Sequence, residues 1–185
     1  MRFPARLEFH AVTAARWPDF ERLFEARGGP KACWCMVFRA MDRKTATSAT
    51  KKAAMRTRVA AGTPIGILGY LDGEPIAWCS VAPKATFERL GDVEDDTADL
   101  ETLRSLTCFF LPRKYRGQGI TAHLIKAAVT HAKTRGARVV EAYPVDPSSP
   151  SYRFMGVVPA FERERFRSVG RAGIRRHIYR RHLRR

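Results

Sequence analysis

The residues best suited to chemistry form one short run, Arg113 to Thr121, which reads Arg-Lys-Tyr-Arg-Gly-Gln-Gly-Ile-Thr. An apolar segment precedes the run and a helical pattern follows it, so the first N–H groups of a helix are expected to be unpaired here. Such groups bind anions at the positive end of the helix dipole. Gly117 and Gly119 carry no Cβ, which lets an anion approach the backbone closely. The run therefore predicts a phosphate or pyrophosphate site.

Two familiar phosphate-binding motifs do not match this run. A P-loop needs Gly-x-x-x-x-Gly-Lys-Ser/Thr, and the sequence contains no such string. A dinucleotide fingerprint needs Gly-x-Gly-x-x-Gly, but Gly119 is followed three residues later by Ala122. A bare Gly-x-Gly also occurs in ordinary tight turns between a strand and a helix, so that explanation stays open.

The cysteines do not predict a metal site or a disulfide framework. Cys33 and Cys35 form a C-x-C pair, but the sequence has no second pair and no histidine at zinc-finger spacing. Cys79 and Cys108 lie in apolar, strand-like segments, where cysteine usually behaves as a small buried hydrophobe. Both could be nucleophiles by residue type, although a structural role is favoured.

Hydrophobic periodicity and turn residues predict the elements that must position the basic run. Strands are expected at 7–12, 65–71, 76–82, 103–111, 138–145, 166–169 and 174–183, and helices at 13–28, 47–61, 120–136 and 159–165. Thr13 is expected to cap the first helix. The order β-α-α-β-β-β-α-β-α-β-β contains one β-α-β crossover, which surrounds the basic run, with antiparallel pairing elsewhere.

Length and composition favour one soluble domain over residues 1–185. The 185 residues are 45% hydrophobic, which is enough for a core and excludes disorder of the whole chain. No apolar run is long enough to span a bilayer, and the N-terminus shows no secretory signal. We therefore expect a cytoplasmic protein that does not enter membranes.

The net charge of +16 predicts affinity for anions. Residues 171–185, expected to form a basic C-terminal strand or tail, contain seven arginines and no acid, whereas residues 88–101 contain seven acids and one base. Nucleic acid, an anionic membrane surface and a phosphorylated cofactor are the candidate partners. General use of arginine on a solvated surface explains the charge about as well. The acidic segment is expected to be a solvated loop.

In its context the basic run resembles motif A of the GNAT superfamily of acyl-CoA-dependent N-acetyltransferases. The motif is Gln/Arg-x-x-Gly-x-Gly/Ala, met here from Arg116 to Ile120, with Thr121 as a departure at its last position. Residues 108–111 resemble the fourth strand of the family, residues 139–145 its fifth strand, and residues 161–166 its Tyr-x-x-x-Gly-Phe region. A particular bacterial branch of the family is resembled by three stretches, 33–36, 78–83 and 141–144.

The resemblance implies an α/β (α+β) fold with a mixed, mostly antiparallel central sheet, helices on both faces and one β-α-β crossover at motif A. It implies acetyl-CoA as the acyl donor. The pyrophosphate would lie on the turn formed by Arg116, Gly117, Gln118, Gly119, Ile120, Thr121 and Ala122, and the pantetheine arm along Phe109, Phe110 and Leu111. The N–H of Leu111 would polarise the thioester carbonyl, which the substrate amine would attack directly.

The acid and base of the reaction are where the sequence departs from the family. The tyrosine that usually protonates the leaving thiolate aligns with Phe161, and the glutamate that some members use as a base aligns with Ser105. Glu141, in an apolar strand, is then the candidate base, and Tyr152 is the candidate acid. A salt bridge to an arginine explains Glu141 equally well, and a packing role is favoured for Tyr152.

The resemblance thus implies an N-acetyltransferase that acts on an unidentified small-molecule or peptide amine, as a monomer or a homodimer. The alternative is a basic protein on the same scaffold that binds nucleic acid or acylates aminoacyl-tRNA. Pairing of residues 171–185 with the acids of residues 88–101 would weaken this alternative, because those cations would then be neutralised within the chain.

Overall fold

The computed structural model describes residues 6–94 and 96–184. Residues 1–5, which belong to the N-terminus in which no secretory signal is expected, lie outside the described residues. The same holds for Asp95 of the acidic segment and for Arg185 of the basic tail.

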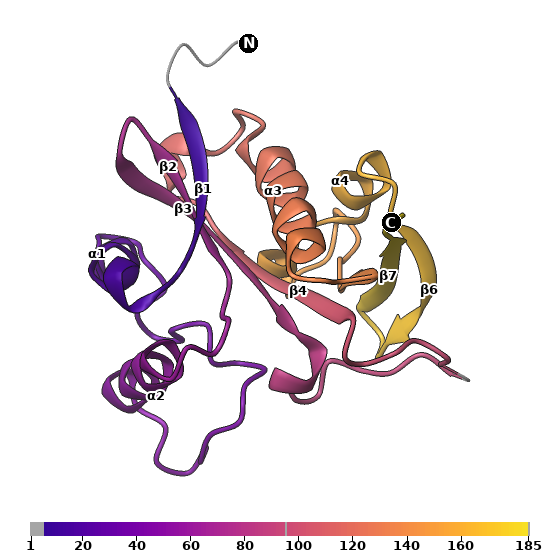
Figure 1. Cartoon of the computed structure of the whole chain (residues 1–185), viewed down its shortest axis with the longest axis horizontal. Coiled ribbons are helices and arrows are strands. Elements are labelled where there is room, and N and C mark those ends of the chain that lie inside the picture. The colour runs from indigo at the N-terminus through magenta and orange to yellow at the C-terminus, as the bar shows by residue number, and fades with distance from the viewer. Residues whose placement is uncertain (1–5, 95, 185) are drawn as a thin grey trace.

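A single seven-stranded sheet organises the described residues, in the order β1-β2-β3-β4-β5-β7-β6 (Figure 1). All neighbouring strands pair antiparallel except β4 and β5, which are parallel and enclose the crossover helix α3. This confirms the predicted α/β (α+β) class. The elements are β1 (Leu7–Ala11), α1 (Trp17–Glu25), α2 (Ser48–Ala60), β2 (Ile67–Leu71), β3 (Glu74–Pro83), β4 (Leu103–Phe110), α3 (Ile120–Thr134), β5 (Val139–Ala142), α4 (Val158–Arg163), β6 (Arg167–Ala172) and β7 (Arg176–His182).

The local sequence explains where most elements begin and end. Asp72 and Gly73 join β2 to β3 with positive φ values of 50° and 83°, as a type I′ hairpin turn requires. Pro18 lies in the first turn of α1, where its missing N–H costs nothing. The expectation that Thr13 caps α1 is wrong, because a 3₁₀ turn (Ala14–Arg16) separates them and the Thr13 side chain makes no capping hydrogen bond.

Helices cover both faces of the sheet, as predicted (Figure 1). On one face, α1 and α2 pack Phe20, Phe24 and Met55 against Trp78 of β3. On the other face, α3 and α4 pack against the opposite side of β3 and β4 in a second buried cluster. The sheet is thus the middle layer of three. Within the described residues, no helix has both the length and the apolar character needed to span a membrane.

The feature of the sheet that matters most for a ligand is the short pairing between β4 and β5. It covers four residue pairs and ends at Leu106 and Ala142. β4 continues to Phe110 with β3 as its only strand partner among the described residues. A bulge at Thr107, between the pairs Val81–Leu106 and Ser80–Cys108, turns the strand just beyond this point. One edge of β4 is therefore open beyond Leu106.

Candidate functional site

The basic run forms the turn between β4 and α3 that the sequence predicts. Gly117 and Gly119 both have positive φ, at 75° and 80°, and Gly119 is the residue before α3. A Cβ built on either glycine would meet no atom within 4 Å, so the space in front of the turn is open. No side chain caps the helix. The first N–H groups of α3 are therefore presented to a cavity and suit an anion such as the pyrophosphate of a coenzyme.

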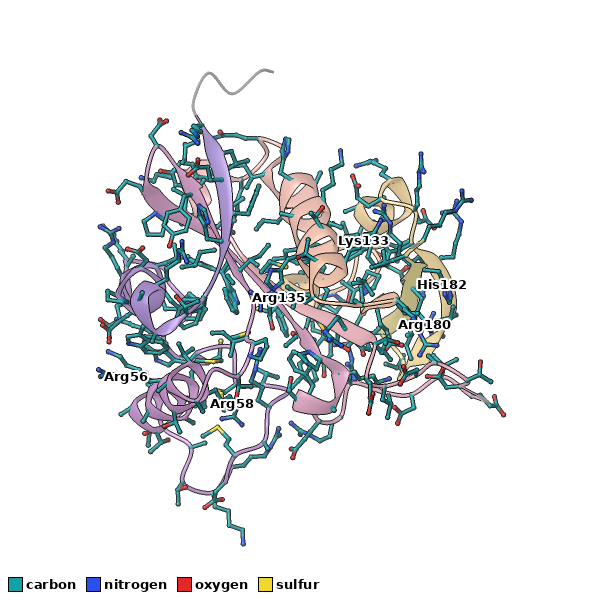
Figure 2. All side chains as sticks on the ribbon, in the orientation of Figure 1. Arg56, Arg58, Lys133, Arg135, Arg180 and His182 are labelled. Carbon is teal, nitrogen blue, oxygen red and sulfur yellow. The ribbon has the colours of Figure 1, made fainter. Side chains whose placement is uncertain are left out.

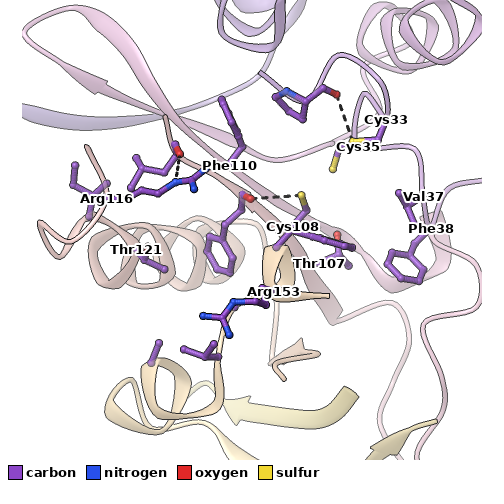
Figure 3. A pocket seen from close by; sticks show the side chains of 18 of the residues that line it. Cys33, Cys35, Val37, Phe38, Thr107, Cys108, Phe110, Arg116, Thr121 and Arg153 are labelled. Carbon is purple, nitrogen blue, oxygen red and sulfur yellow. Dashed lines mark hydrogen bonds between the residues drawn. The ribbon is translucent and has the colours of Figure 1, made fainter. Parts of the chain in front are cut away.

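This turn and the open edge of β4 line one cavity of about 760 Å³ (Figure 3). At one end lie the glycines and Arg116, whose Nε donates to the Leu111 carbonyl oxygen at 2.9 Å. Thr107 and Cys108 line the cavity farther along β4. The cavity thus runs from the start of α3 along β4, which is the path predicted for a coenzyme with a pyrophosphate and an extended arm.

Most residues predicted to bind the cofactor meet at this cavity. Those that line it are Phe109, Phe110, Leu111, Arg116, Gly117, Gly119, Ile120 and Thr121. Gln118 and Ala122 do not line it. The Gln118 side chain donates a hydrogen bond to the Lys114 carbonyl oxygen at 2.8 Å. The Ala122 N–H donates a hydrogen bond to the Gly119 carbonyl oxygen at 3.1 Å. The free backbone N–H groups of Ile120 and Thr121 are therefore better placed to bind a phosphate than that of Ala122. The cofactor-binding role of the whole set stays a prediction.

The opposite wall contains residues that the sequence analysis did not assign to a site. Cys33, Cys35, Val37 and Phe38 come from the segment between α1 and α2, and Arg153 comes from the loop before α4. Figure 3 shows Cys35 and Val37 on the side of the cavity away from Arg116 and Thr121. The signal for this wall was the Cys33-Trp34-Cys35 pair, which the sequence analysis considered as a metal motif and as part of the family resemblance, but not as part of a binding site. In the described part of the chain no cluster of His, Cys, Asp and Glu could hold a metal ion.

Glu141 lies in β5 and is fully buried. Its carboxylate contacts Lys84 Nζ at 2.9 Å and Arg180 Nε at 2.6 Å, and it accepts a hydrogen bond from the Tyr143 hydroxyl. Burial, the first cause, and the Glu141 charge raise the pKa of Tyr143 well above its usual value. Glu141 is not among the cavity-lining residues. This geometry favours the salt-bridge explanation over the catalytic one, and the catalytic prediction itself remains untested.

Tyr152 and the two positions that align with family catalytic residues also lie off the cavity wall. The Tyr152 side chain is exposed, packs beside Phe154 and receives the Arg176 guanidinium over its ring. Phe161 is buried against Phe109 and Phe166. Ser105 is buried and shares a hydrogen bond of 3.0 Å with the Tyr143 hydroxyl. The prediction that Tyr152 is the acid therefore has little geometric support: Tyr152 does not line the cavity, although the next residue, Arg153, does.

The acidic segment and the basic tail pair with each other in part. Arg180 binds Asp96 through two contacts of 2.7 and 2.5 Å, and Arg176 donates to the Leu90 carbonyl oxygen at 3.0 Å. The prediction that the acidic segment is merely a solvated loop is therefore incomplete. Figure 2 labels further basic residues on α2 and at the end of α3, so these cations are spread over separate elements.

Comparisons with known proteins identify a family and a fold for the chain. The profile of the acetyltransferase (GNAT) family matches residues 15–156. Solved structures that resemble the chain include an N-acetyltransferase from Staphylococcus aureus Mu50, with 13% identity, a TM-score of 0.57 and coverage of 97% of this chain and 99% of that one. A Salmonella typhimurium protein solved with its cofactor acetyl-CoA has 11% identity, a TM-score of 0.58 and coverage of 97% and 95%.

A third solved structure, ribosomal-protein-alanine N-acetyltransferase from Brucella melitensis, has 14% identity, a TM-score of 0.56 and coverage of 95% of this chain and 99% of that one. At these identities the likeness concerns the fold alone. No curated relative matches the sequence.

Proposed function

Because the chain belongs to the GNAT family of acetyltransferases, we propose that it transfers an acetyl group from acetyl-CoA to the nitrogen of a small-molecule or peptide amine. The resemblance inferred from motif A is confirmed by the family match, and the family uses acetyl-CoA. The observation that carries the proposal is a single cavity that joins the free N–H groups at the start of α3 to the open edge of β4.

The chain offers acetyl-CoA three kinds of contact along this cavity. The amides of Ile120 and Thr121 face the position for the pyrophosphate, with Arg116 beside them. The open edge of β4 offers backbone groups that an extended pantetheine arm can pair with like an added strand. The N–H of Leu111 is the proposed donor to the thioester carbonyl oxygen, where negative charge develops during transfer.

The nucleic-acid alternative has less support. Part of the basic C-terminal strand is neutralised by Asp96, and the cations labelled in Figure 2 come from different elements: α2, the end of α3 and β7. A nucleic-acid surface usually collects its Lys and Arg residues on one face. The pairing predicted to weaken this alternative is present at Arg180.

Calorimetric titration with acetyl-CoA tests the proposal. Gly119→Val should reduce the affinity by about 100-fold, because a branched side chain would fill the open space and block two hydrogen bonds from the backbone to the pyrophosphate. Gly136→Val is the matched control. Gly136 follows the other end of α3, has a similar φ of 79°, and also has no atom within 4 Å of a built Cβ.

The two variants share the strain of a branched residue at positive φ and differ in whether the side chain faces the cavity. Affinity lost only in Gly119→Val supports the coenzyme site. Wild-type protein that fails to bind millimolar acetyl-CoA, or equal affinity in the two variants, would contradict it.

A further inference from the structure

A second cavity, of about 490 Å³, lies apart from the cavity proposed for the coenzyme. Its lining comes from the end of β1, the loop between α2 and β2, the end of β3, the start of β4 and the last turn of α3. The two cavities share no lining residue. Because α3 begins at the coenzyme cavity and ends at the second one, they lie at opposite ends of this helix. A cavity of this size suits a small molecule.

The charged side chains of the second cavity are all cations or can become cations. They are Arg104 at the start of β4, His131 in the last turn of α3 and Arg135 directly after that helix. None of the described residues that line the cavity is Asp or Glu. The Nη2 of Arg104 donates to the Arg135 carbonyl oxygen at 3.3 Å, which brings the Arg104 guanidinium to the end of α3. Groups of like charge repel one another at such short range, and an anion between them would remove the repulsion.

Within the described part of the chain, no carboxylate neutralises these cations. Arg104 donates to the carbonyl oxygens of Glu101 at 2.7 Å and Leu103 at 3.4 Å, in addition to that of Arg135. Carbonyl groups at the end of a helix attract a cation, which explains where Arg104 lies but leaves its full charge without a counter-ion. The side chains of His131 and Arg135 have neither a hydrogen-bond partner nor an ion-pair partner among the described residues.

The repulsion is felt most directly by His131. Its pKa lies below the usual value, first because of burial and then because of the charges of Arg135 and Arg104. The other segments that line the cavity belong to residues 11–14, 59–66 and 81–83, and they contain no titratable side chain. The two arginines are therefore the charged groups of the cavity that act on the imidazole. A bound anion would favour the imidazolium and raise this pKa.

The remaining wall offers hydroxyl groups and apolar surface. Thr13 makes no capping hydrogen bond, and the hydroxyls of Thr13 and Thr63 have no partner among the described residues. Both threonines line the cavity. Three valines, here called the valine wall, also line it and are buried: Val12, Val59 and Val81. The cavity thus combines cations and free hydroxyl donors with a surface that suits an apolar group.

We propose that the second cavity binds a small organic anion, whose carboxylate or phosphate group lies between Arg104, His131 and Arg135. The two guanidinium groups and the imidazolium donate charge-assisted hydrogen bonds to its oxygen atoms. Its apolar body packs on the valine wall. This site is separate from acetyl transfer, and it goes beyond the proposed function because none of its residues belongs to the coenzyme cavity.

Proton NMR of the His131 ring tests the site locally, which matters because a chain of net charge +16 attracts anions elsewhere as well. Full-length protein saturated with coenzyme A is titrated with phenylacetate, and the His131 signal is identified by its loss in His131→Gln. We expect a saturable shift of this signal and a rise of about one unit or more in the pKa of His131. By linkage, the affinity for phenylacetate should rise several-fold between about pH 8 and pH 5.5, where the carboxylate stays ionised.

A matched pair of variants separates the cavity from general surface charge. Arg135→Gln should reduce the affinity for phenylacetate by about tenfold or more, since it removes charge-assisted hydrogen bonds. Lys133→Gln is the control and should change the affinity by about twofold at most, because salt screens its charge. Lys133 carries the same charge at the same end of α3 (Figure 2) but does not line the cavity.

Four further probes define the chemistry of the ligand. Benzyl alcohol lacks the charge, inorganic phosphate and acetate lack the apolar body, and phenyl phosphate exchanges the carboxylate for a phosphate. The preferred phenyl compound should bind at least about tenfold more tightly than benzyl alcohol and than the inorganic phosphate or acetate that carries its head group. The tighter binder of phenylacetate and phenyl phosphate identifies the anionic group.

Three results would overturn the proposal. They are a His131 signal that stays fixed or shifts without saturation, equal losses of affinity in Arg135→Gln and Lys133→Gln, and binding of inorganic phosphate or acetate as tight as that of the matching phenyl compound. Each would leave the proposed function intact, because acetyl-CoA binding is measured separately. Failure to bind acetyl-CoA would instead contradict the proposed function and leave this site untouched.

Discussion

Glu141 is a carboxylate whose burial has a structural explanation. It is fully buried, and its two oxygens are shared among Lys84, Arg180 and Tyr143, which come from three different parts of the chain. A buried charge is tolerated when it is paired and hydrogen-bonded, and removal of one partner leaves the others unpaired. The carboxylate therefore holds β5, β7 and the segment after β3 together.

Replacement of this carboxylate should affect folding more than turnover. We expect Glu141→Gln to reduce the free energy of unfolding by about 3 kcal/mol or more, because Lys84 and Arg180 would lose their buried anion. Urea denaturation measures the change. Glu74→Gln is the control, since Glu74 is an exposed surface residue and should change stability by at most about 0.5 kcal/mol.

Normal stability combined with a 100-fold loss of turnover in Glu141→Gln would restore the predicted role of this residue as a base, since general base catalysis contributes about that factor or more.

The residue-scale predictions succeeded where chemistry is local in the sequence. The turn from Gly117 to Thr121 could be predicted because the glycines, the cations and the helix start are contiguous. The partners of Glu141 could not, because Arg180 lies 39 residues away. Arg39 was missed for the same reason, since only folding brings its guanidinium to Ser80 and Ile65.

At the scale of elements, the strong apolar patterns predicted all seven strands and four helices of the described chain, with errors mainly at their ends. The strand expected at 138–145 ends at Ala142, because β5 leaves its pairing with β4 there. Apolar pattern cannot predict that departure, since Tyr143 and Val145 remain buried after the strand has ended. The gap that forms the cavity was therefore implied only by the family resemblance.

The ion pair between Arg180 of β7 and Asp96 of the acidic segment, here called the anchor, should appear in the pH dependence of stability. The Arg180 hydrogen bond is the main cause that lowers the pKa of Asp96 to about 2, from its usual 3.8. A lowered pKa contributes stability that is present above about pH 4 and is lost as the pH falls toward 2. We expect a loss of roughly 2 kcal/mol over this window, from the size of the pKa difference.

Asp96→Asn should lack this part of the acid transition, so its stability should vary less between pH 4 and pH 2 than that of the wild type. Asp92→Asn is a suitable control, because Asp92 is 92% exposed and 3.3 Å from Lys84. Denaturation by urea at several pH values measures both. Identical pH profiles for wild type and Asp96→Asn would show that the anchor does not contribute in solution.

For the whole molecule, charge is distributed so that the cavity has no anionic side chain. The chain carries a net charge of +16, and none of the described residues that line the cavity is Asp or Glu. Its charged lining residues are all arginines: Arg39, Arg116 and Arg153. These arginines repel a polycation that approaches the site, and no carboxylate of the cavity lining can compensate for the hydration that the polycation loses on binding.

Acceptor preference should follow from this field. With acetyl-CoA as donor, an apolar monoamine such as phenylethylamine should have a kcat/KM at least about tenfold above that of spermidine or an aminoglycoside. The release of free thiol measures turnover, and added salt should narrow the difference because it screens the repulsion. Preference for spermidine at low salt would contradict this prediction.

The short pairing of β4 with β5 also governs how the molecule can deform. Within the sheet, four residue pairs between β4 and β5 connect the strands β1 to β4 with the strands β5 to β7. A connection of four pairs offers little resistance to torsion, whereas β4 is paired with β3 along almost its whole length. A molecule bound in the gap beyond Leu106 would contact both groups of strands and restrict the movement of one group relative to the other. The rigidity of this fold at its reactive centre would then be supplied by the substrate that it binds.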